Sequence, residues 1–526
     1  MFKVVTPIAI VLVLTLASHS AQAGCDFYAA PDLLGDAQGG PTGVAGADGT
    51  SAEPFVMADF WDRGFALPGA TLCLKDGIYR GADSMLDVTP NTNGALGNPI
   101  TIRAVNDGGV FIDGEDLRRP FRLRWSNYWV LEGFNVANSS AFAVSIGGDI
   151  SGTRIHHVTV RRVVAWDALI TNGSSNNFHV WGIDYADDVL LEDVAGFGTG
   201  RKVFTVYRSR RVTMRRAFAR WEGSGGGSAI PISCIYRSYD VICENNIAVW
   251  TAEQQPSIGV PSGGRGALAM DWLAYGDESW AADGDLNFDP KNAQMRMLGN
   301  IAIVPADLPD DPGSMPPTPL TPASATWMAY IKGVEYINNV AIANRNDMPL
   351  WRVEGCIDKP SAAAFCDWAI GLDETEAPLI ARHNTGWGGN NLRKFTGWTV
   401  DDDRLEVAYG DPPPDVFQGT MGATVCHRYV DGELRDGTGV SAAEPLWPWP
   451  MNERILAATT AAVGHSPEDV TARIEGLLGP IPAACSAVAV PTGSGWGLAA
   501  LALLLGAVAA ITAPRARPAL DIPAAK

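Results

Sequence analysis

The densest cluster of basic residues in this chain lies between residues 201 and 220. That stretch holds eight basic residues and no acidic one, although the 526-residue chain has 58 acidic against 39 basic residues and a formal net charge of −19. Like charges at this density repel one another, so the cluster predicts a surface that an anion neutralises. The acidic balance of the whole chain argues against general nucleic-acid binding. The cluster consists of Arg201, Lys202, Arg208, Arg210, Arg211, Arg215, Arg216 and Arg220.

Three expected strands place part of this cluster on one face. They are His179–Ala186, Lys202–Ser209 and Pro231–Ser238, and the tripeptide Tyr-Arg-Ser occurs in both the second and the third. Alternate residues of a strand point to opposite faces. When the three segments are aligned, one outward face is expected to carry His179, Asp184, Lys202, Tyr207, Arg208, Tyr236 and Arg237.

These residue types suit β-elimination of a uronic-acid polymer. The reaction needs the substrate carboxylate neutralised, a base for the adjacent C5 proton and an acid for the leaving oxygen. Arg208 and Arg237 are expected to neutralise and orient the carboxylate by bidentate pairing. We expect Lys202 or His179 to act as the base.

The same hypothesis assigns the acid and the substrate contacts. Tyr207 or Tyr236 is expected to protonate the leaving oxygen, since a tyrosine can both stack on a sugar and donate a proton. Glu222 follows Trp221 beside a glycine-rich loop, which suits the lining of a sugar site. The expected substrate-binding residues are Arg201, Asp184, Trp221 and Glu222.

Three alternatives remain open from the residues alone. Hydrolysis on this kind of scaffold needs paired carboxylates, and the candidates are Asp167, Asp184, Asp187, Asp188, Glu222 and Asp271. The corner arginines could instead be paired with acids such as Asp193 and Glu244. A surface protein of this kind could also bind glycans or form a stalk without any catalysis.

Calcium is the one cofactor for which the sequence offers a candidate binding segment. Oxygen ligands alternate in the segment from 283 to 289, as they do in calcium loops. The segment lacks the glycine at the sixth position and the distal glutamate of an EF-hand, so an ordinary loop is the competing interpretation. The candidate ligands are Asp283, Asp285, Asn287 and Asp289.

A repeated frame indicates the elements that position these residues. It has two alternating apolar residues, a polar break and two more apolar residues, the last pair expected to face inward, as in Ala195 and Phe197. Its sixth position is often asparagine, which suits a left-handed one-residue corner and can stack into a ladder: Asn135, Asn246, Asn300, Asn339 and Asn384. Eight copies begin at Val130, Val158, Val189, Val212, Val241, Met295, Val334 and Leu379.

A frame repeated at these spacings, without helices between the copies, predicts a solenoid. The fold class is therefore all-β, a parallel β-helix over residues 68–390. We expect an N-terminal cap over residues 24–67 and an irregular C-terminal cap with short helices over 391–489.

The first turns resemble a known family. Three segments are similar to the opening coils of the right-handed parallel β-helix family of secreted polysaccharide lyases, which includes pectate-lyase-like and chondroitinase-B-like proteins. These segments are Pro68–Arg80, Gly97–Arg103 and Val110–Gly114. The resemblance implies a right-handed helix and an acidic polysaccharide as partner. Related lyases use Lys and Arg, often with calcium, but no motif of this chain matches their catalytic residues one by one.

Both ends of the chain carry targeting features. Residues 1–23 have the basic start, apolar run and small-residue cleavage site of a secretory signal. The octet at 490–497 resembles the motif of IPTL-CTERM sorting tails of Gram-negative bacteria, and an apolar span and two arginines follow it. The resemblance implies export, transient anchoring by the span in residues 490–526, and processing by sorting machinery at the cell surface. A plain C-terminal membrane anchor is the alternative.

The eight cysteines favour disulfides, because an even number in an exported chain is typical of pairing. Eight thiols allow 105 pairings, so the sequence alone does not fix the map. Their order suggests four sequential pairs: Cys25–Cys73, Cys234–Cys243, Cys356–Cys366 and Cys426–Cys485.

Overall fold

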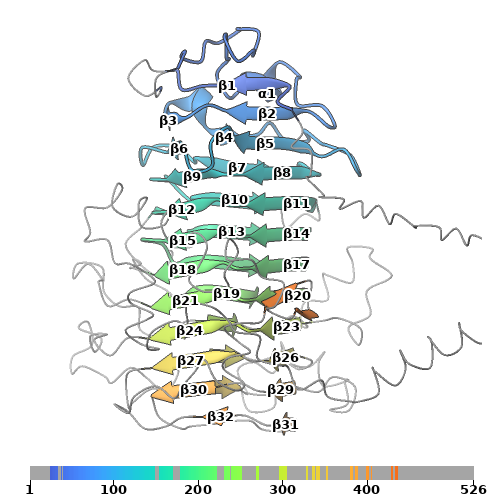
Figure 1. Cartoon of the computed structure of the whole chain (residues 1–526), viewed down its shortest axis with the longest axis vertical. Coiled ribbons are helices and arrows are strands. Elements are labelled where there is room, and N and C mark those ends of the chain that lie inside the picture. Colours follow the sequence, from blue (N-terminus) through green and yellow to red (C-terminus); the bar gives the residue numbers. More distant parts are fainter. Residues whose placement is uncertain are drawn as a thin grey trace, which may run out of the picture.

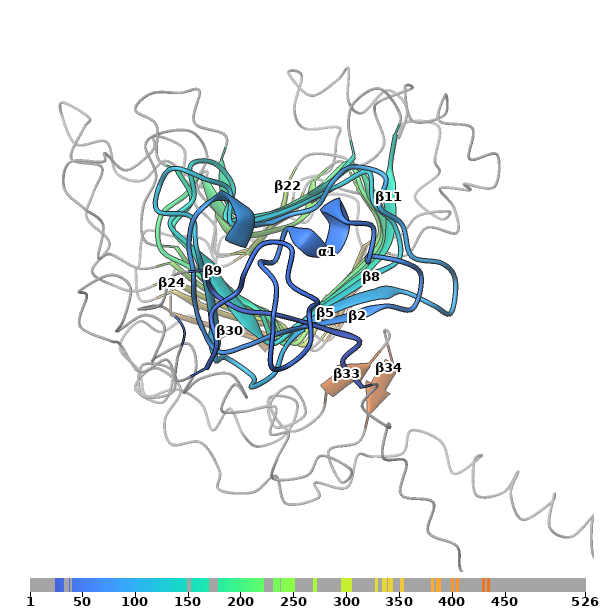
Figure 2. The same cartoon turned by 90° about the horizontal axis from the view of Figure 1, so that it is seen from above.

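The chain folds as a right-handed parallel β-helix. This computed structural model describes residues 24–32, 37, 40–148, 153–169, 178–221, 230–236 and 238–250, and short stretches between 268 and 435. Three parallel sheets run along the helix, and successive turns add strands to each of them (Figure 1). Seen from the N-terminal end, the strands succeed one another clockwise while they recede from the viewer, which is the right-handed sense (Figure 2).

Each sheet collects the equivalent strands of successive turns. The first contains β1 (Phe27–Ala29), β2 (Thr71–Leu74), β5 (Ile100–Ala104), β8 (Trp129–Glu132), β11 (Ile155–Arg161), β14 (Ala186–Glu192), β17 (Arg210–Arg215), β20 (Tyr239–Glu244), β23 (Met295–Leu298), β26 (Val334–Ile337), β29 (Ile380–Arg382) and β31 (Thr399–Asp401). The second contains β3 (Gly77–Tyr79), β6 (Val110–Asp113), β9 (Phe134–Ala137), β12 (Val164–Trp166), β15 (Ala195–Phe197), β18 (Phe218–Trp221), β21 (Ile247–Trp250), β24 (Ile301–Val304), β27 (Val340–Ala343), β30 (Thr385–Gly388) and β32 (Arg404–Leu405). The third contains β4 (Leu86–Asp87), β7 (Phe121–Arg124), β10 (Val144–Gly147), β13 (His179–Asp184), β16 (Lys202–Tyr207), β19 (Ile230–Tyr236), β22 (Leu268–Asp271), β25 (Trp327–Ala329) and β28 (Trp351–Val353). Outside these sheets lie the helix α1 (Asp59–Asp62), the 3₁₀ turn η1 (Ala82–Ser84) and the antiparallel pair β33 (Arg428–Val430) and β34 (Glu433–Arg435).

The core lies between the three sheets and is filled by stacked columns of apolar residues. The predicted inward positions of the first sheet stack in register, as Val158, Val189 and Val212 do. Each of these three side chains is at most 2% exposed. Burying one such side chain contributes roughly 1.5–3 kcal/mol, so each turn is stabilised by the turns above and below it.

The first copy of the frame starts one residue earlier than the sequence indicated. Val158 pairs with Trp129 and not with Val130. A slip of one residue exchanges the two faces of a strand, so Leu131 is buried and Glu132 is partly exposed. The prediction that Asn135 lies at a corner is wrong for the same reason, because Asn135 lies within β9 and pairs with Val164 of β12. Trp129 and Val130 are both large and apolar, so the alternation alone could not show which of them begins the frame.

The second sheet faces the opposite way from the prediction. Gly196 faces the core, because a Cβ there would lie 2.9 Å from the Trp181 ring. Its neighbours Ala195 and Phe197 therefore point outward, yet both are fully buried, and Trp166 stacks on Phe197 with ring centroids 5.4 Å apart. The prediction was wrong because the one-residue corner shifts the alternation, which puts the bulky residues on the outer face.

The predicted asparagine ladder exists at Asn246, Asn300 and Asn339. The backbone N–H of Asn246 donates to Oδ1 of Asn300 at 2.9 Å, and that of Asn300 donates to Oδ1 of Asn339 at 3.0 Å. All three side chains are fully buried. The left-handed residue of the corner is the preceding one, Asn245 with φ of 54°, which corrects the predicted position by one. Asn384 lies outside the described residues.

The N-terminal end of the helix is closed by a cluster of phenylalanines. Phe27 of β1 packs against Phe55, Phe60 and Phe65 with ring centroids 4.8–5.9 Å apart. Phe60 belongs to α1 and is fully buried. These rings cover the first coil, whose core would otherwise be open to water.

Two of the suggested disulfides are present. Cys25–Cys73 joins the chain start to β2, and Cys234–Cys243 joins β19 to β20, with Cα atoms 5.7 and 6.6 Å apart. The described part of the chain contains no other cysteine. The cysteines of the suggested pairs Cys356–Cys366 and Cys426–Cys485 lie outside the described residues.

The terminal segments also lie outside the described residues. They comprise the signal-like residues 1–23, the expected C-terminal helices and the sorting-type tail at 490–526. Within the part of the chain that is described, no helix is both long enough and apolar enough to cross a membrane.

Candidate functional site

The outward face of the third sheet brings the predicted site residues into columns. The register of β13 and β16 sets His179 beside Lys202 and Asp184 beside Tyr207. On the next strand, Tyr207 pairs with Tyr236. Neighbouring strands lie about 4.8 Å apart, so side chains of one column are within reach of each other.

A bend at the start of β13 turns His179 to this outer face. Val180 and Trp181 both pack in the core, so the alternation of the strand is interrupted between them. The His179 ring meets Phe142 edge to face, with centroids 5.3 Å apart. Phe142 in turn lies over Gly182, where a Cβ would come within 2.6 Å of the ring. Glycine at this position therefore allows Phe142 to cover the imidazole.

Lys202 is nearly closed off from solvent, with 1% exposure. Its Nζ donates to Oγ of Ser233 on β19 at 3.1 Å. Burial lowers the pKa of His179 well below 6.5, and the charges of Lys202 and Arg201 lower it further, so the imidazole is neutral at pH 7. Nδ1 of His179 has no hydrogen-bond partner among the described residues, nor does Oγ1 of Thr205.

Asp184 reaches the surface of this cluster. It is partly exposed, whereas Lys202 and His179 are buried. Desolvation raises the pKa of Asp184 to about 7 from an ordinary 3.8, and the charge of Lys202 opposes the rise. A carboxyl group with this pKa can accept or give up a proton at neutral pH, as general acid–base catalysis requires.

Arg208 is held at the corner between the third and first sheets by two tyrosines. It has a left-handed backbone with φ of 47°. Its guanidinium lies 5.6 Å from the ring centre of Tyr185 and 5.3 Å from that of Tyr207, and Nη1 donates to Oη of Tyr185 at 2.9 Å. Both tyrosines and the arginine remain partly exposed. A planar cation held in this way suits bidentate pairing with a carboxylate.

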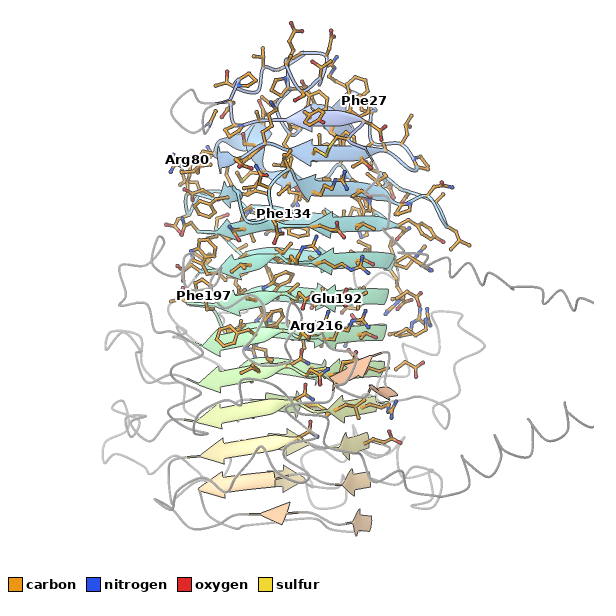
Figure 3. All side chains as sticks on the ribbon, in the orientation of Figure 1. Phe27, Arg80, Phe134, Glu192, Phe197 and Arg216 are labelled. Atoms are coloured by element: carbon orange, nitrogen blue, oxygen red, sulfur yellow. A yellow bond between two sulfur atoms is a disulfide. The ribbon has the colours of Figure 1, made fainter. Side chains whose placement is uncertain are left out.

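Part of the basic cluster is neutralised on the first sheet. Arg161, Glu192, Arg215 and Glu244 form a column of alternating charge, with Nε of Arg161 and of Arg215 at 2.8 and 2.7 Å from Glu192. Arg216 adds a further bond to Glu192 at 2.7 Å (Figure 3). Burial opposes the ionisation of Glu192, but the arginines outweigh it and lower its pKa to about 2. The prediction that this part of the cluster binds an external anion is therefore wrong.

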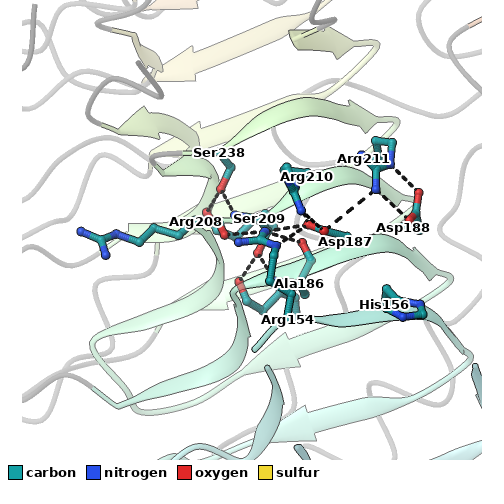
Figure 4. A network of polar contacts seen from close by, with 12 residues as sticks. Arg154, His156, Ala186, Asp187, Asp188, Arg208, Ser209, Arg210, Arg211 and Ser238 are labelled. Carbon is teal, nitrogen blue, oxygen red and sulfur yellow. Dashed lines mark hydrogen bonds and ion pairs between the residues drawn. The ribbon is translucent and has the colours of Figure 1, made fainter. Parts of the chain in front are cut away.

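The beginning of β17 is neutralised in the same way. Nε of Arg210 donates to the buried Asp187 at 2.9 Å, and Arg154 donates to the same carboxylate at 2.8 Å. Arg211 binds Asp188 at 2.6 Å. Figure 4 shows the Arg208 side chain pointing away from this network. Asp187 and Asp188 are therefore arginine partners within the fold, and the predicted anion site is left to the third sheet and its corner.

Several predicted residues are described incompletely or not at all. Only the backbone of Tyr236 and of Trp221 is described, and both lie in strands of the β-helix. The residues outside the described part are Arg237, Glu222, Asp283, Asp285, Asn287 and Asp289. Among the described residues, no group of three or more His, Cys, Asp or Glu side chains is arranged to hold a metal ion.

Sequence reasoning missed four residues of this face. Tyr185 occupies the corner one coil before Arg208, so aligning the corners as well as the strands would have found it. Ser233 and Thr205 share a column of β19 and β16, but small polar residues on a strand give no distinctive signal. Phe142 reaches the site from the segment before β10, and nothing in the local sequence indicates this contact.

Comparison with known proteins finds only remote structural similarity. No family model matches the chain, and no curated protein matches it. Similar solved structures include pectate lyase Pel9A, with a TM-score of 0.40 and 13% identity over 73% of this chain and 78% of that one. An alginate lyase from Paenibacillus sp. str. FPU-7 has a TM-score of 0.36 and 10% identity over 67% and 96% of the two chains. A lacto-N-biosidase from Eubacterium ramulus has a TM-score of 0.32 and 9% identity over 73% and 68%. Similarities at this level assign no reaction to the chain.

Proposed function

We propose that this protein binds an acidic polysaccharide on the outward face of its third sheet and cleaves it by β-elimination. The observation that carries the proposal is the meeting of three groups on that face: the partly exposed Asp184 carboxyl, the buried Lys202 ammonium and the Arg208 guanidinium held between two tyrosines. Together they offer proton transfer beside a carboxylate-binding cation, which is the combination that the reaction needs.

Each group has a distinct part in the proposed reaction. Arg208 pairs with the uronate carboxylate and so makes the proton on C5 more acidic. Asp184 removes that proton, a double bond forms between C4 and C5, and the C4–oxygen bond breaks with its electron pair on the oxygen. Tyr207, one coil further on, protonates the leaving oxygen and regains its proton from solvent. No water is consumed.

Burial changes the role expected for Lys202 and His179. Both were candidates for the base, but their exposures of 1% and 6% keep them beneath the surface that a polymer would touch. Lys202 is therefore proposed as a positioning residue, whose charge limits the rise in the pKa of Asp184. His179, neutral and packed under Phe142, is proposed to support the same cluster.

Hydrolysis is less well supported on this face. Asp271 lies in the same column as Asp184, but Tyr207 and Tyr236 stand between them, so three strand spacings separate the two acids. That is about 14 Å, whereas paired glycosidase carboxylates lie roughly 5–9.5 Å apart. Asp187 and Asp188 are already bound by arginines.

The pH dependence of turnover tests the roles of Asp184 and Lys202. Asp184 must be ionised to accept a proton, so kcat/KM on a uronate polymer should rise through about pH 7. Lys202→Met removes the charge that lowers this pKa, and the rise should move to higher pH. Lys202→Arg keeps the charge and should leave the rise near its original position. If the pH dependence of kcat/KM is the same in Lys202→Met as in the unaltered protein, Lys202 does not position or tune Asp184.

Substitution of Asp184 tests whether the protein is catalytic on this face. Asp184→Asn should lower kcat by about 10²–10⁴-fold, the usual contribution of a general base, while binding of the polymer is retained. Arg211→Gln is the matched control, because Arg211 is exposed and bound to Asp188 on another face. Full activity in Asp184→Asn would contradict the assignment, and binding without turnover in the unaltered protein would favour a glycan-binding role.

We also propose that the chain is exported and sorted to the cell surface. The signal-like residues 1–23 and the motif, apolar run and arginines of residues 490–526 support this. The disulfides Cys25–Cys73 and Cys234–Cys243 are consistent with an oxidising compartment.

A further inference from the structure

Three arginines lie together on the third sheet, on the N-terminal side of the proposed reaction site. Arg122 and Arg124 occupy the outward positions of β7, where the two alternating residues are fully buried. Arg119 lies just before the strand. Asp87 of β4 is their carboxylate neighbour among the described residues, and it accepts bonds from Arg122 at 2.6 and 2.8 Å.

Within the described part of the chain, this cluster has an excess of positive charge that the first sheet does not have. Among the described residues, neither Arg119 nor Arg124 forms an ion pair, and Arg124 lies over the ring of its neighbour Trp125, 3.9 Å from the ring centre. Burial lowers the pKa of Arg119, and the charges of Arg122 and Arg124 lower it further while Asp87 partly opposes them. On the first sheet, by contrast, arginines alternate with glutamates. Crowded guanidinium groups of this kind are stabilised by an added anion.

The register aligns this cluster with the proposed reaction site. Arg124 pairs with Gly147 of β10, and Gly147 pairs with Asp184 of β13. Two strand spacings separate Arg124 from Asp184, which is about 10 Å along the helix axis. The residue between them is a glycine, so no side chain rises from the sheet in this column. An extended polymer can therefore follow the column from one site to the other.

We propose that Arg119, Arg122 and Arg124 bind a second acidic group of the same polysaccharide, so that the substrate runs along the helix axis from β7 to β16. This inference rests on the proposed function, because it takes the Asp184 face as the place where an acidic glycan reacts. It adds a length requirement: a substrate too short to reach β7 gains nothing from the three arginines.

Oligouronates of different lengths test this requirement. Arg119→Gln and Arg124→Gln should each weaken binding of a hexauronate about tenfold, the usual loss for one charge-assisted contact. Both variants should bind a diuronate as the unaltered protein does. Arg211→Gln, which removes an exposed arginine from the first sheet, should change neither affinity. Because Arg119 and Arg124 are partly exposed and form no ion pair with described residues, circular dichroism should show an unchanged fold.

The outcomes separate this inference from the proposed function. If the unaltered protein cleaves uronates and both arginine variants bind the hexamer normally, the second site is wrong and the reaction site stands. Equal weakening for the dimer and the hexamer would also contradict the length requirement. If the unaltered protein binds neither oligouronate at low salt, where such contacts are least screened, both proposals fall together.

Discussion

Replacing Glu192 by Gln tests how much the alternating charges of the first sheet stabilise the fold. Glu192 accepts bonds from three arginines, and its pKa lies at about 2 against an ordinary 4.5. Each pKa unit corresponds to about 1.4 kcal/mol, so the ionised form contributes roughly 3 kcal/mol to the free energy of unfolding. The side chain is only 12% exposed, so solvent screens this interaction little.

The sign of the pH dependence follows from the lowered pKa. The contribution is fully present above the unfolded pKa near 4.5 and is lost as the pH falls towards 2. Urea unfolding of Glu192→Gln should therefore show a loss of roughly 3 kcal/mol at pH 7, and the difference from the unaltered protein should disappear near pH 2. Asp188→Asn, which breaks an exposed pair with Arg211, should cost less than about 1 kcal/mol. A constant difference from pH 7 to pH 2 would refute the electrostatic explanation.

Three further predictions concern the rest of the chain. Asn300→Ala leaves the backbone N–H of Asn246 and the carbonyl of Cys243 without their ladder partner, so urea unfolding should show a loss of about 1–3 kcal/mol for each buried group; an unchanged midpoint would mean that water replaces the amide. Non-reducing mass spectrometry of the exported protein should find all eight cysteines oxidised, with Cys356–Cys366 and Cys426–Cys485 as the remaining pairs, and alkylation of any of these four thiols would contradict that. Mature protein from the native host should end near residue 490, whereas intact peptides beyond Ala513 would identify a permanent anchor.

The fold was predictable because its signals are repeated. A single two-residue alternation is ambiguous, but eight copies of one frame, without helices between them, leave few architectures other than a β-helix. The details that failed are those that depend on one residue. The choice between Trp129 and Val130, and the shift of alternation at each corner, change which face a side chain occupies without changing the pattern of apolar residues.

The sequence predicted which site residues lie side by side on neighbouring strands, but not which arginines form ion pairs. Coil spacing alone placed His179 beside Lys202 and Asp184 beside Tyr207, and the structure confirms both pairs. Spacing could not show which arginines meet a carboxylate on the next coil. The prediction therefore assigned anion binding to the whole basic cluster at residues 201–220, including arginines that are paired within the fold. The smaller group at Arg119, Arg122 and Arg124 was not predicted, although two of its three arginines form no ion pair with described residues.

The products formed from an acidic polysaccharide test the central proposal most directly. The unaltered protein, incubated with a panel of uronate polymers, should release oligosaccharides that absorb in the ultraviolet as unsaturated uronates and whose masses show no added water. Asp184→Asn should release none, and Arg211→Gln should release them at the normal rate. Products that carry an added water and no ultraviolet band would show hydrolysis, and the absence of any product across the panel would contradict a catalytic role.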